Sequence, residues 1–542
     1  MRRSRIASKE GSGMLDIRIL GGTVVDGTGR AGFYADVGVQ DGKIAVIGNL
    51  SDVQAARTID ARGCCVTPGF IDIHRHADAR PLYEDFGKAE LMQGLTTVVN
   101  GNCGLSSAPC PPEYRRDIYA YLAPVTGRVP ENLQTQTLED YFAQMKRLPL
   151  RINVGMLAGL GTLRAGVCGY APVMDEAAQN KLRARLETAL GSGVLGISLG
   201  LGYAPESFFS TRELIDALQP MHESGIPITV HMRQEGSEVT QALAEMLTVA
   251  RVIDTPVEIS HLKAIGRVNW RSAVPRMLQM LRLARQDGLS VGCDVYPYPA
   301  GSTQLVHILP PELQYGGAAA ITRRLHDAAF RARARERMQT GDDFENIVKL
   351  VGWEHIVLSS LNREENRPLT GKSVAEAAEL LGKEPYDCAF DLLESEACAA
   401  TMIDFITDEA DITEILQAEF SCVISDATYP DTGLWHPRVY GAFARMLQHF
   451  VRETRALTLP EAVYKMAGRP AEVLGLVKKG RIAAGLDADV CVFDPNAVCE
   501  CGTYQDPAQY ARGMRYVLVN GQLAVENGAF ADCFSGRVVT HE

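Results

Sequence analysis

Between Val66 and Ala427, short β-branched hydrophobic runs alternate with longer stretches in which apolar residues recur at helical spacing. Segments such as DEAAQNKLRARLETAL and ALAEMLTVARVI have the pattern of amphipathic helices. The apolar runs predict eight strands, VTPGFIDIHRH, TTVVNGNCG, INVGMLAG, LGISLGLG, PITVHMR, VEISHLK, SVGCDVYPY and SCVISDA. Repeated βα units predict a parallel sheet, and eight of them predict an α/β fold of the (β/α)8 barrel type.

Polar residues fall at the same place in most of these strands, because the apolar run ends in His, Cys, Lys, Tyr or Asp. In a (β/α)8 barrel the catalytic groups lie at the C-terminal ends of the strands. A doubly wound sheet also alternates β and α, but it usually carries a glycine-rich phosphate turn after the first strand, and this sequence has none there. We therefore expect a barrel with a site at its mouth.

The two flanks have a different pattern, with short strands joined by DG, NG and other glycine-rich turns. We expect residues 14–65 and 478–542 to pair into one small β-sandwich beside a catalytic barrel formed by residues 66–477. Residues of about 299–420 separate the seventh and eighth predicted strands and contain helical patterns of their own. Insertions at this place lie over the barrel mouth and often act as lids.

Composition changes this picture little. The chain has 542 residues, 46% hydrophobic and 22% charged, which suits a globular protein with a large core. A net charge of −12, spread along the chain, argues against nucleic-acid and anionic-membrane partners and leaves a small-molecule substrate. The opening MRRSRIASKEGSG is basic, but Asp16 and Arg18 follow where an export signal needs apolar residues, so we expect a cytoplasmic protein. Most of the 13 cysteines are expected to be free.

The first candidate metal ligands are His74 and His76, which follow the apolar run GFIDI. Side chains two residues apart leave a strand on the same face and can share one ion. Cys103, in the turn GNCG after the second strand, could bring a thiolate close to the same ion.

Two later strands end in the same way, at His231 in VHMRQE and at His261 in ISHLK. One cysteine and two histidines from three strands make a tetrahedral zinc site with its fourth position open for water. Asp426 ends the eighth strand, which closes against the first, and it could accept a proton from a metal-bound water.

These residues resemble the amidohydrolase superfamily, and within it the D-aminoacylase or N-acyl-D-amino acid deacylase family. The resemblance covers nearly the whole chain and includes GGTVVDGTG, PGFIDIHRH, QGLTTVVNGNCGLSSAP, GISLGLGYAP, YPYPAGST, HPRVYGAF and AGLDADVCVFDP. Many amidohydrolases bridge two metals with a carboxylated lysine that ends the fourth strand, whereas this family has a cysteine at the second. The only lysines between His76 and His231 are Lys88, Lys146 and Lys181, and none ends a predicted strand.

The resemblance implies one tight zinc, held by Cys103, His231 and His261, and a second, weaker position bordered by His74, His76 and Asp426. It also implies that the substrate carboxylate is recognised by three further residues, Lys263, Tyr296 and Arg438. Lys263 lies two residues beyond His261 and so shares its face of the strand.

The activity implied is zinc-dependent hydrolysis of N-acyl-D-amino acids to a D-amino acid and a carboxylate. The same site could serve a D-residue dipeptidase or a cyclic-amide (hydantoin-like) hydrolase, and a non-enzymatic alternative is an inactive scaffold with this fold. The chain departs from the family pattern at Leu160, where a histidine is usual, and at Ala427, where glycine is usual. Both departures lie near the expected pocket and bear on substrate choice.

Overall fold

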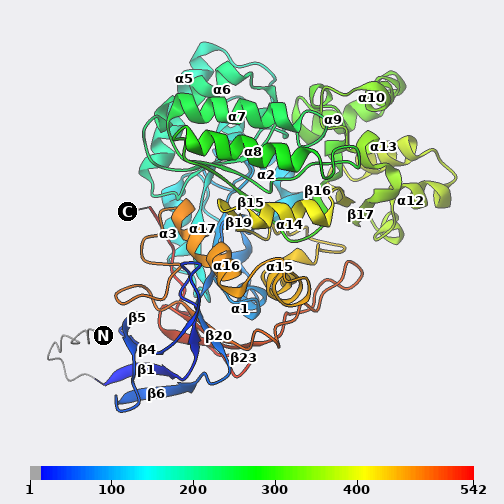
Figure 1. Cartoon of the computed structure of the whole chain (residues 1–542). Coiled ribbons are helices and arrows are strands. Elements are labelled where there is room, and N and C mark those ends of the chain that lie inside the picture. The colour runs from blue at the N-terminus through cyan, green and yellow to red at the C-terminus, as the bar shows by residue number, and fades with distance from the viewer. Residues whose placement is uncertain (1–13, 542) are drawn as a thin grey trace.

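The computed structural model describes residues 14–541, so the opening segment MRRSRIASKEGSG and the expectation attached to it lie outside the described residues. A ring of parallel strands forms the centre of the molecule (Figure 1). Its members are β8 (Phe70–Asp72), β9 (Leu95–Asn100), β10 (Asn153–Met156) with its continuation β11 (Ala158–Gly159), β12 (Ile197–Gly200), β13 (Ile228–His231), β14 (Val257–Ile259), β15 (Val291–Val295) and β19 (Ser421–Val423).

Backbone contacts between the first and last strands close this ring. A parallel bridge joins Arg75 to Ala427, and the Asp426 amide donates to the His74 carbonyl at 2.9 Å. The predicted (β/α)8 barrel is thereby confirmed, and each predicted strand contains one of the strands named above. Because the strands are buried on both faces, they read as nearly continuous apolar runs.

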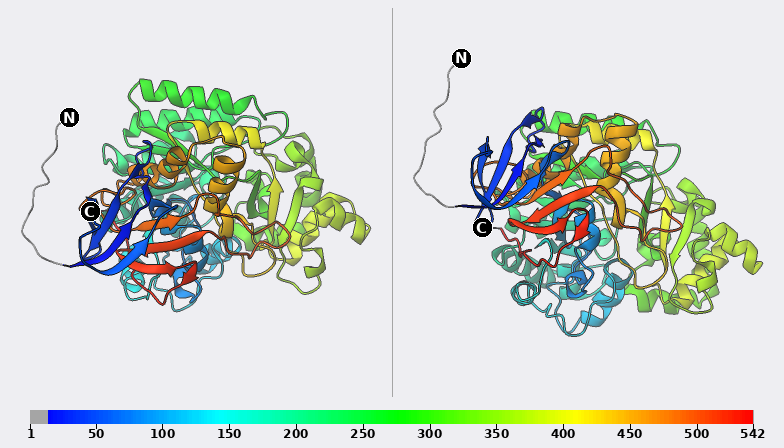
Figure 2. Two further views of the ribbon diagram at one scale, coloured as in Figure 1. Left: turned by 60° about the horizontal axis from the view of Figure 1, so that its bottom comes forward. Right: turned by 90° about the horizontal axis from the view of Figure 1, so that it is seen from below.

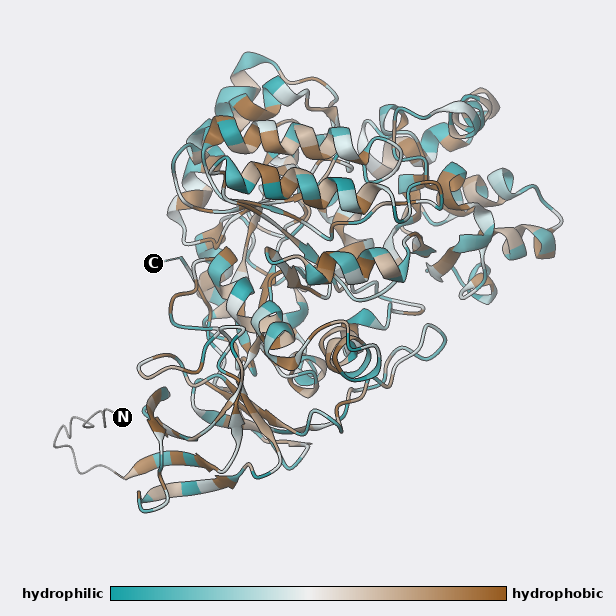
Figure 3. Ribbon diagram, in the orientation of Figure 1, coloured by the Kyte–Doolittle hydropathy of each residue, from teal (hydrophilic) through white to brown (hydrophobic). Residues whose placement is uncertain are grey.

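Helices follow the strands around the barrel, and most present an apolar stripe to it and a polar face outward (Figure 3). In chain order they are α1 (Lys88–Met92), α2 (Arg115–Thr126), α3 (Leu138–Met145), α4 (Leu160–Cys168), α5 (Glu176–Gly191), α6 (Thr211–Ala217), α7 (Val239–Ile253), α8 (Ala273–Gln286), α14 (Glu409–Gln417), α15 (Arg438–Arg445), α16 (Leu459–Val463) and α17 (Arg469–Val473). Two π-helical segments, Met446–Glu453 and Tyr464–Gly468, continue α15 and α16.

Strands from both ends of the chain share one sheet beside the barrel (Figure 2). This seven-stranded sheet contains β2 (Thr23–Val24), β3 (Phe33–Tyr34), β7 (Cys65–Pro68), β20 (Val490–Phe493), β21 (Met514–Val519), β22 (Gln522–Glu526) and β23 (Ala529–Phe530). A four-stranded sheet packs on it through a common apolar core and contains β1 (Leu15–Leu20), β4 (Asp36–Gln40), β5 (Lys43–Gly48) and β6 (Ala55–Asp60). Beyond these sheets, Arg537 and Val539 hydrogen-bond to Val154 of the barrel. The exact domain boundaries stay a prediction.

The segment between β15 and β19 has an apolar core of its own. It contains an antiparallel sheet of β16 (Ala300–Gln304), β18 (Thr401–Phe405) and β17 (Ile356–Ser360), and the helices α9 (Gly317–Leu325), α10 (Ala328–Thr340), α11 (Ile347–Val351), α12 (Val374–Leu381) and α13 (Pro385–Ser395). It projects to one side of the barrel (Figure 1). The last helix before β19, α14, packs against α8 and β15 and therefore belongs with the barrel helices.

All 13 cysteines lie in the described residues and are free. Among residues 14–541, no helix is both long and apolar enough to cross a bilayer.

Candidate metal centre

The expected ligands lie where the barrel strands give way to loops, and three of these residues have left-handed backbones. The φ angles are 53° at Cys103, 37° at His261 and 51° at Asp426. The turn that carries Cys103 is anchored by Asn102, whose side-chain amide donates to carbonyls of both flanking strands, including Val99 at 3.2 Å. Non-glycine residues rarely adopt this conformation, and when they do they cluster at functional sites.

Cys103, His231 and His261 converge on one point from three strand ends. The Cys103 Sγ lies 3.4 Å from His261 Nε2, and His231 Nδ1 lies 3.0 Å from the same nitrogen. Zinc bond lengths and tetrahedral angles imply about 3.4 Å between two nitrogen ligands and about 3.6 Å between nitrogen and sulfur. The three donor atoms therefore fit a zinc ion, and the fourth tetrahedral direction carries no ligand from this set.

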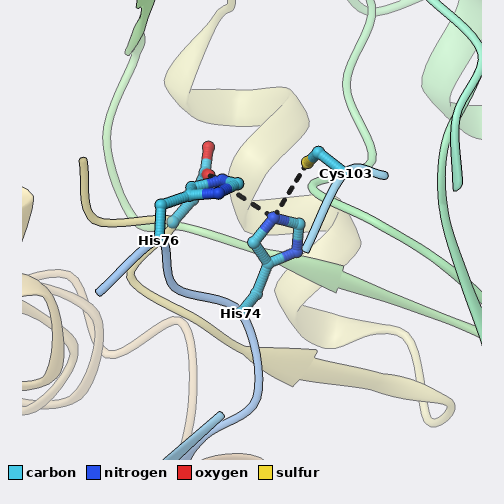
Figure 4. A group of neighbouring side chains, drawn as sticks. His74, His76 and Cys103 are labelled. Carbon is cyan, nitrogen blue, oxygen red and sulfur yellow. Dashed lines mark hydrogen bonds and ion pairs between the residues drawn. The ribbon is translucent and has the colours of Figure 1, made fainter. Parts of the chain in front are cut away.

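A second group of donors contains Cys103, His74 and His76 (Figure 4). Asp426 completes this group. His74 Nε2 lies 3.2 Å from the Cys103 Sγ and 3.4 Å from Asp426 Oδ1. His76 Nε2 lies 3.2 Å from the same carboxylate oxygen. Because the sulfur belongs to both groups, it stands where one ligand could contact two ions.

Burial prepares most of these groups to bind a cation. It lowers the pKa of His231 and His261 well below the usual value, so both imidazoles are neutral and can coordinate. Burial would also lower the pKa of His74, but Cys103, Asp294 and Asp426 together raise it well above the usual value. Burial raises the pKa of the Cys103 thiol to about 11, and a bound metal ion deprotonates such a thiol outright.

Asp426 is held as a carboxylate by its neighbours. Burial alone would raise its pKa, but Arg438, His76 and His74 hold it well below the usual value. Arg438 Nη1 lies 2.9 Å from Asp426 Oδ2, and the guanidinium is fully buried over the Tyr296 ring at 4.7 Å. Among the described residues, Arg438 Nε and Nη1 have no aligned hydrogen-bond partner. The contact with Asp426 is therefore an ion pair that leaves two donors free.

Lys263 is buried rather than solvated, and its ammonium lies 2.6 Å from Glu235 Oε2. The other oxygen of Glu235 lies 3.0 Å from His261 Nδ1. The Lys263 ammonium also lies 2.8 Å from His261 Nδ1, so both contacts are made by this ring nitrogen while Nε2 faces Cys103. The Tyr296 ring lies 5.8 Å from the Lys263 nitrogen, so the three residues expected to recognise a carboxylate are brought together.

Two carboxylates that contact the candidate ligands, Glu235 and Asp294, were not predicted from the sequence. Glu235 stands inside the motif VHMRQE and directly precedes Gly236, and a charged residue at the start of a loop gave no reason to single it out. Asp294 accepts a hydrogen bond from the His261 amide, and its Oδ2 lies 3.7 Å from His74 Nδ1. The strand alternation places Asp294 on the same face as Tyr296, which was the available signal.

The three lysines considered above lie in or at the end of helices, Lys88 in α1, Lys146 after α3 and Lys181 in α5. The fourth barrel strand, β12, contains no lysine. Leu160 begins α4 and Ala427 pairs with Arg75, and both side chains are buried.

The fold and the donor set define a hydrolase-like barrel with a buried metal-ligand cluster at the carboxyl ends of its strands. A model of the amidohydrolase family matches residues 57–525. D-aminoacylase from Alcaligenes xylosoxydans xylosoxydans is 33% identical over 98% of this chain and 99% of its own length. N-acyl-D-glutamate deacylase from the same organism is also 33% identical, over 94% of this chain and 93% of its own.

Among solved structures, the N-acyl-D-glutamate deacylase of Bordetella bronchiseptica, complexed with zinc and a phosphonate inhibitor, superposes with a TM-score of 0.82. It is 31% identical, and the match covers 97% of this chain and all of that one. The chain therefore belongs to the amidohydrolase family, in the group of the D-aminoacylases and N-acyl-D-amino acid deacylases.

Proposed function

We propose that this protein hydrolyses the amide bond of N-acyl-D-amino acids and releases a D-amino acid and a carboxylate. The observation that carries the proposal is the convergence of Cys103, His231 and His261 beside an ionised Asp426. Three protein donors with a free fourth direction are the arrangement of catalytic zinc. The similar proteins described above include enzymes named for the same reaction.

In this proposal Cys103, His231 and His261 hold the zinc ion, and His74, His76 and Asp426 border a second, weaker position. When bound, zinc supplies Lewis acidity to the scissile carbonyl and acidity to the attacking water.

The residues of the chain perform the remaining steps. Asp426 takes the proton of the attacking water at Oδ1 and delivers it to the leaving nitrogen, which is general acid-base catalysis by one carboxylate. Arg438 keeps Asp426 ionised and offers its free Nε and Nη1 donors to the substrate carboxylate. Lys263 and Tyr296 border the same space and complete the recognition of that carboxylate.

Two of the alternatives are less consistent with this site. A cyclic-amide hydrolase of the lysine-bridged type needs a lysine on the fourth strand, and β12 has none. Six buried donors form two groups, and within each group the donor atoms lie within 4.8 Å of one another. This arrangement favours a metal enzyme over an inactive scaffold.

The test is hydrolysis of a panel of N-acetyl-D-amino acids and their L-enantiomers by protein prepared with one zinc equivalent. We expect cleavage of D-substrates and little of L-substrates. Cleavage of both enantiomers alike, or of D-dipeptides and hydantoins in preference, contradicts the proposal.

A further inference from the structure

Asp404, on β18 of the insertion, has a buried carboxylate oxygen that no group in the described part of the chain satisfies. The residue is 2% exposed, and its Oδ1 has no hydrogen-bond partner among residues 14–541. A buried oxygen of this kind costs free energy unless a donor reaches it. A donor group on a bound molecule can therefore complete the hydrogen bonding of this oxygen.

Asp404 lies beside the residues proposed to bind the substrate carboxylate. A Cβ atom placed on Gly301 would lie 2.8 Å from Asp404 Oδ1 and 3.4 Å from the Tyr296 hydroxyl oxygen. Both oxygens therefore lie close to the backbone of Gly301, where a side chain would collide with Asp404. The Tyr296 ring is in turn flanked by Arg438 at 4.7 Å and Lys263 at 5.8 Å.

The adjoining wall leads from Asp404 to the proposed zinc ligands. Gly301 pairs with Asp404 across the sheet, and Thr303 lies two residues further along β16 on the same face. The Thr303 hydroxyl lies 3.5 Å from the Tyr203 hydroxyl, and the Tyr203 ring covers His231 at 4.3 Å. Between the metal centre and Asp404, this wall offers uncharged polar groups.

The cations beside Asp404 already have anionic partners. Lys263 pairs with Glu235 at 2.6 Å, and Arg438 faces Asp426 at 2.9 Å. Burial raises the pKa of Asp404 to about 6, although Lys263 and Arg438 act to lower it, so the carboxylate is ionised above neutral pH. One substrate carboxylate can be met by the free donors of Arg438, whereas a second one would face Asp404 and gain like-charge repulsion.

We propose that Asp404 determines side-chain specificity by accepting a hydrogen bond from the D-side chain of the substrate. The preferred substrates are then N-acyl-D-amino acids whose side chain ends in an uncharged donor, a carboxamide or a hydroxyl group. Those with an acidic side chain are rejected. This inference rests on the proposed function and names its substrate class.

The sharpest test uses two substrates of nearly equal shape, N-acetyl-D-glutamine and N-acetyl-D-glutamate, assayed at pH 8. We expect the zinc-loaded enzyme to cleave the glutamine substrate with a kcat/KM higher by about 10- to 150-fold, the value of one charge-assisted hydrogen bond. In Asp404→Asn this ratio falls toward one, because a carboxamide can donate to a carboxylate as well as accept from an amide.

Thr303→Val is the matched control, since it removes a polar group from the same wall without changing its charge, and the ratio should persist. Zinc content, measured in each variant, should stay at that of the unmutated enzyme. If the unmutated enzyme cleaves the glutamate substrate as well as the glutamine substrate, or if Asp404→Asn keeps the ratio, the role of Asp404 is refuted.

Three further outcomes keep the test decisive. If Asp404→Asn does not fold, inhibition of the unmutated enzyme by the two products decides, and stronger inhibition by D-glutamate than by D-glutamine overturns the proposal. If N-acetyl-D-leucine is cleaved while the glutamine preference fails, only the inference about Asp404 falls. If no N-acetyl-D-amino acid is cleaved, the proposed function falls with it.

Discussion

Arg438 is the residue whose removal should affect two steps at once. Its guanidinium lies 2.9 Å from Asp426 Oδ2, and its free donors face the space proposed for the substrate carboxylate. Arg438→Met keeps much of the buried volume and removes the charge. Loss of one charge-assisted hydrogen bond to the substrate costs about 1.5–3 kcal/mol, which is about 10- to 150-fold in kcat/KM.

The second effect concerns the pH dependence, and its sign follows from the ion pair. Arg438 is the strongest of the charges that lower the pKa of Asp426, so its removal raises that pKa. The proposed general base must be ionised, and activity is lost as the pH falls through its pKa. The acidic limb of the kcat/KM profile should therefore move to higher pH in the variant.

The two effects separate in an assay of an N-acetyl-D-amino acid and its C-terminal primary amide between about pH 4 and pH 9, a span that includes the ordinary pKa values of carboxyl and imidazole groups. On the high-pH plateau Asp426 is ionised in both enzymes. There the variant should cleave the acid more slowly than the unmutated enzyme does, whereas its rate with the amide should change little. The acidic limb should shift for both substrates.

The matched control is Arg445→Met on the same helix, because Arg445 pairs with Glu409 and Glu500 and not with Asp426. Equal losses for acid and amide on the plateau would refute the carboxylate clamp. An acidic limb that stays in place would refute the role of Arg438 toward Asp426.

Substitutions at three residues, with one control at Glu238, test the centre itself. Asp426→Asn should retain tight zinc and lose about 10²- to 10⁴-fold in kcat, and near-normal turnover would assign the proton transfer to another group. Glu235→Gln should weaken zinc binding about 10- to 100-fold in a chelator competition, while the exposed neighbour Glu238→Gln should not. Cys103→Ala and Cys103→Gly should both lose the tight zinc, which metal analysis measures. In urea unfolding of the two metal-free variants, Cys103→Gly should have the larger free energy of unfolding, by about 1 kcal/mol, because alanine is strained at a φ of 53°. Equal or greater stability of the alanine variant would contradict the left-handed turn.

The barrel and most of the candidate ligand set follow from local rules that can be read in the sequence. Strands buried on two faces read as apolar runs, and catalytic groups gather at their carboxyl ends. His74, Cys103, His231 and Asp426 each stand at such an end, so the rule finds them without any knowledge of distances.

The residues that the sequence did not reveal depend on packing between distant segments. Glu235 lies in the loop beyond β13, and only the folded chain places it between His261 and Lys263. Asp404 is more than a hundred residues from Tyr296 along the chain, and it approaches the site because β18 pairs with β16. The pairing of Arg438 with Asp426 likewise depends on the folded structure, which places the start of α15 beside the end of β19.

The left-handed residues indicate how the centre keeps its shape. Each such backbone costs about 1–3 kcal/mol, and the cost persists only where surrounding contacts impose the conformation. Here neighbouring strands impose it: the Asp426 amide donates to the His74 carbonyl at 2.9 Å, and the His261 amide donates to Asp294. Each acceptor belongs to the strand next to its donor in the closed ring. Hydrogen bonds between neighbouring strands therefore hold the strained conformation at each of these residues. The barrel thus helps to order the donor atoms through its own strand contacts, and a bound ion adds its binding free energy to that of folding.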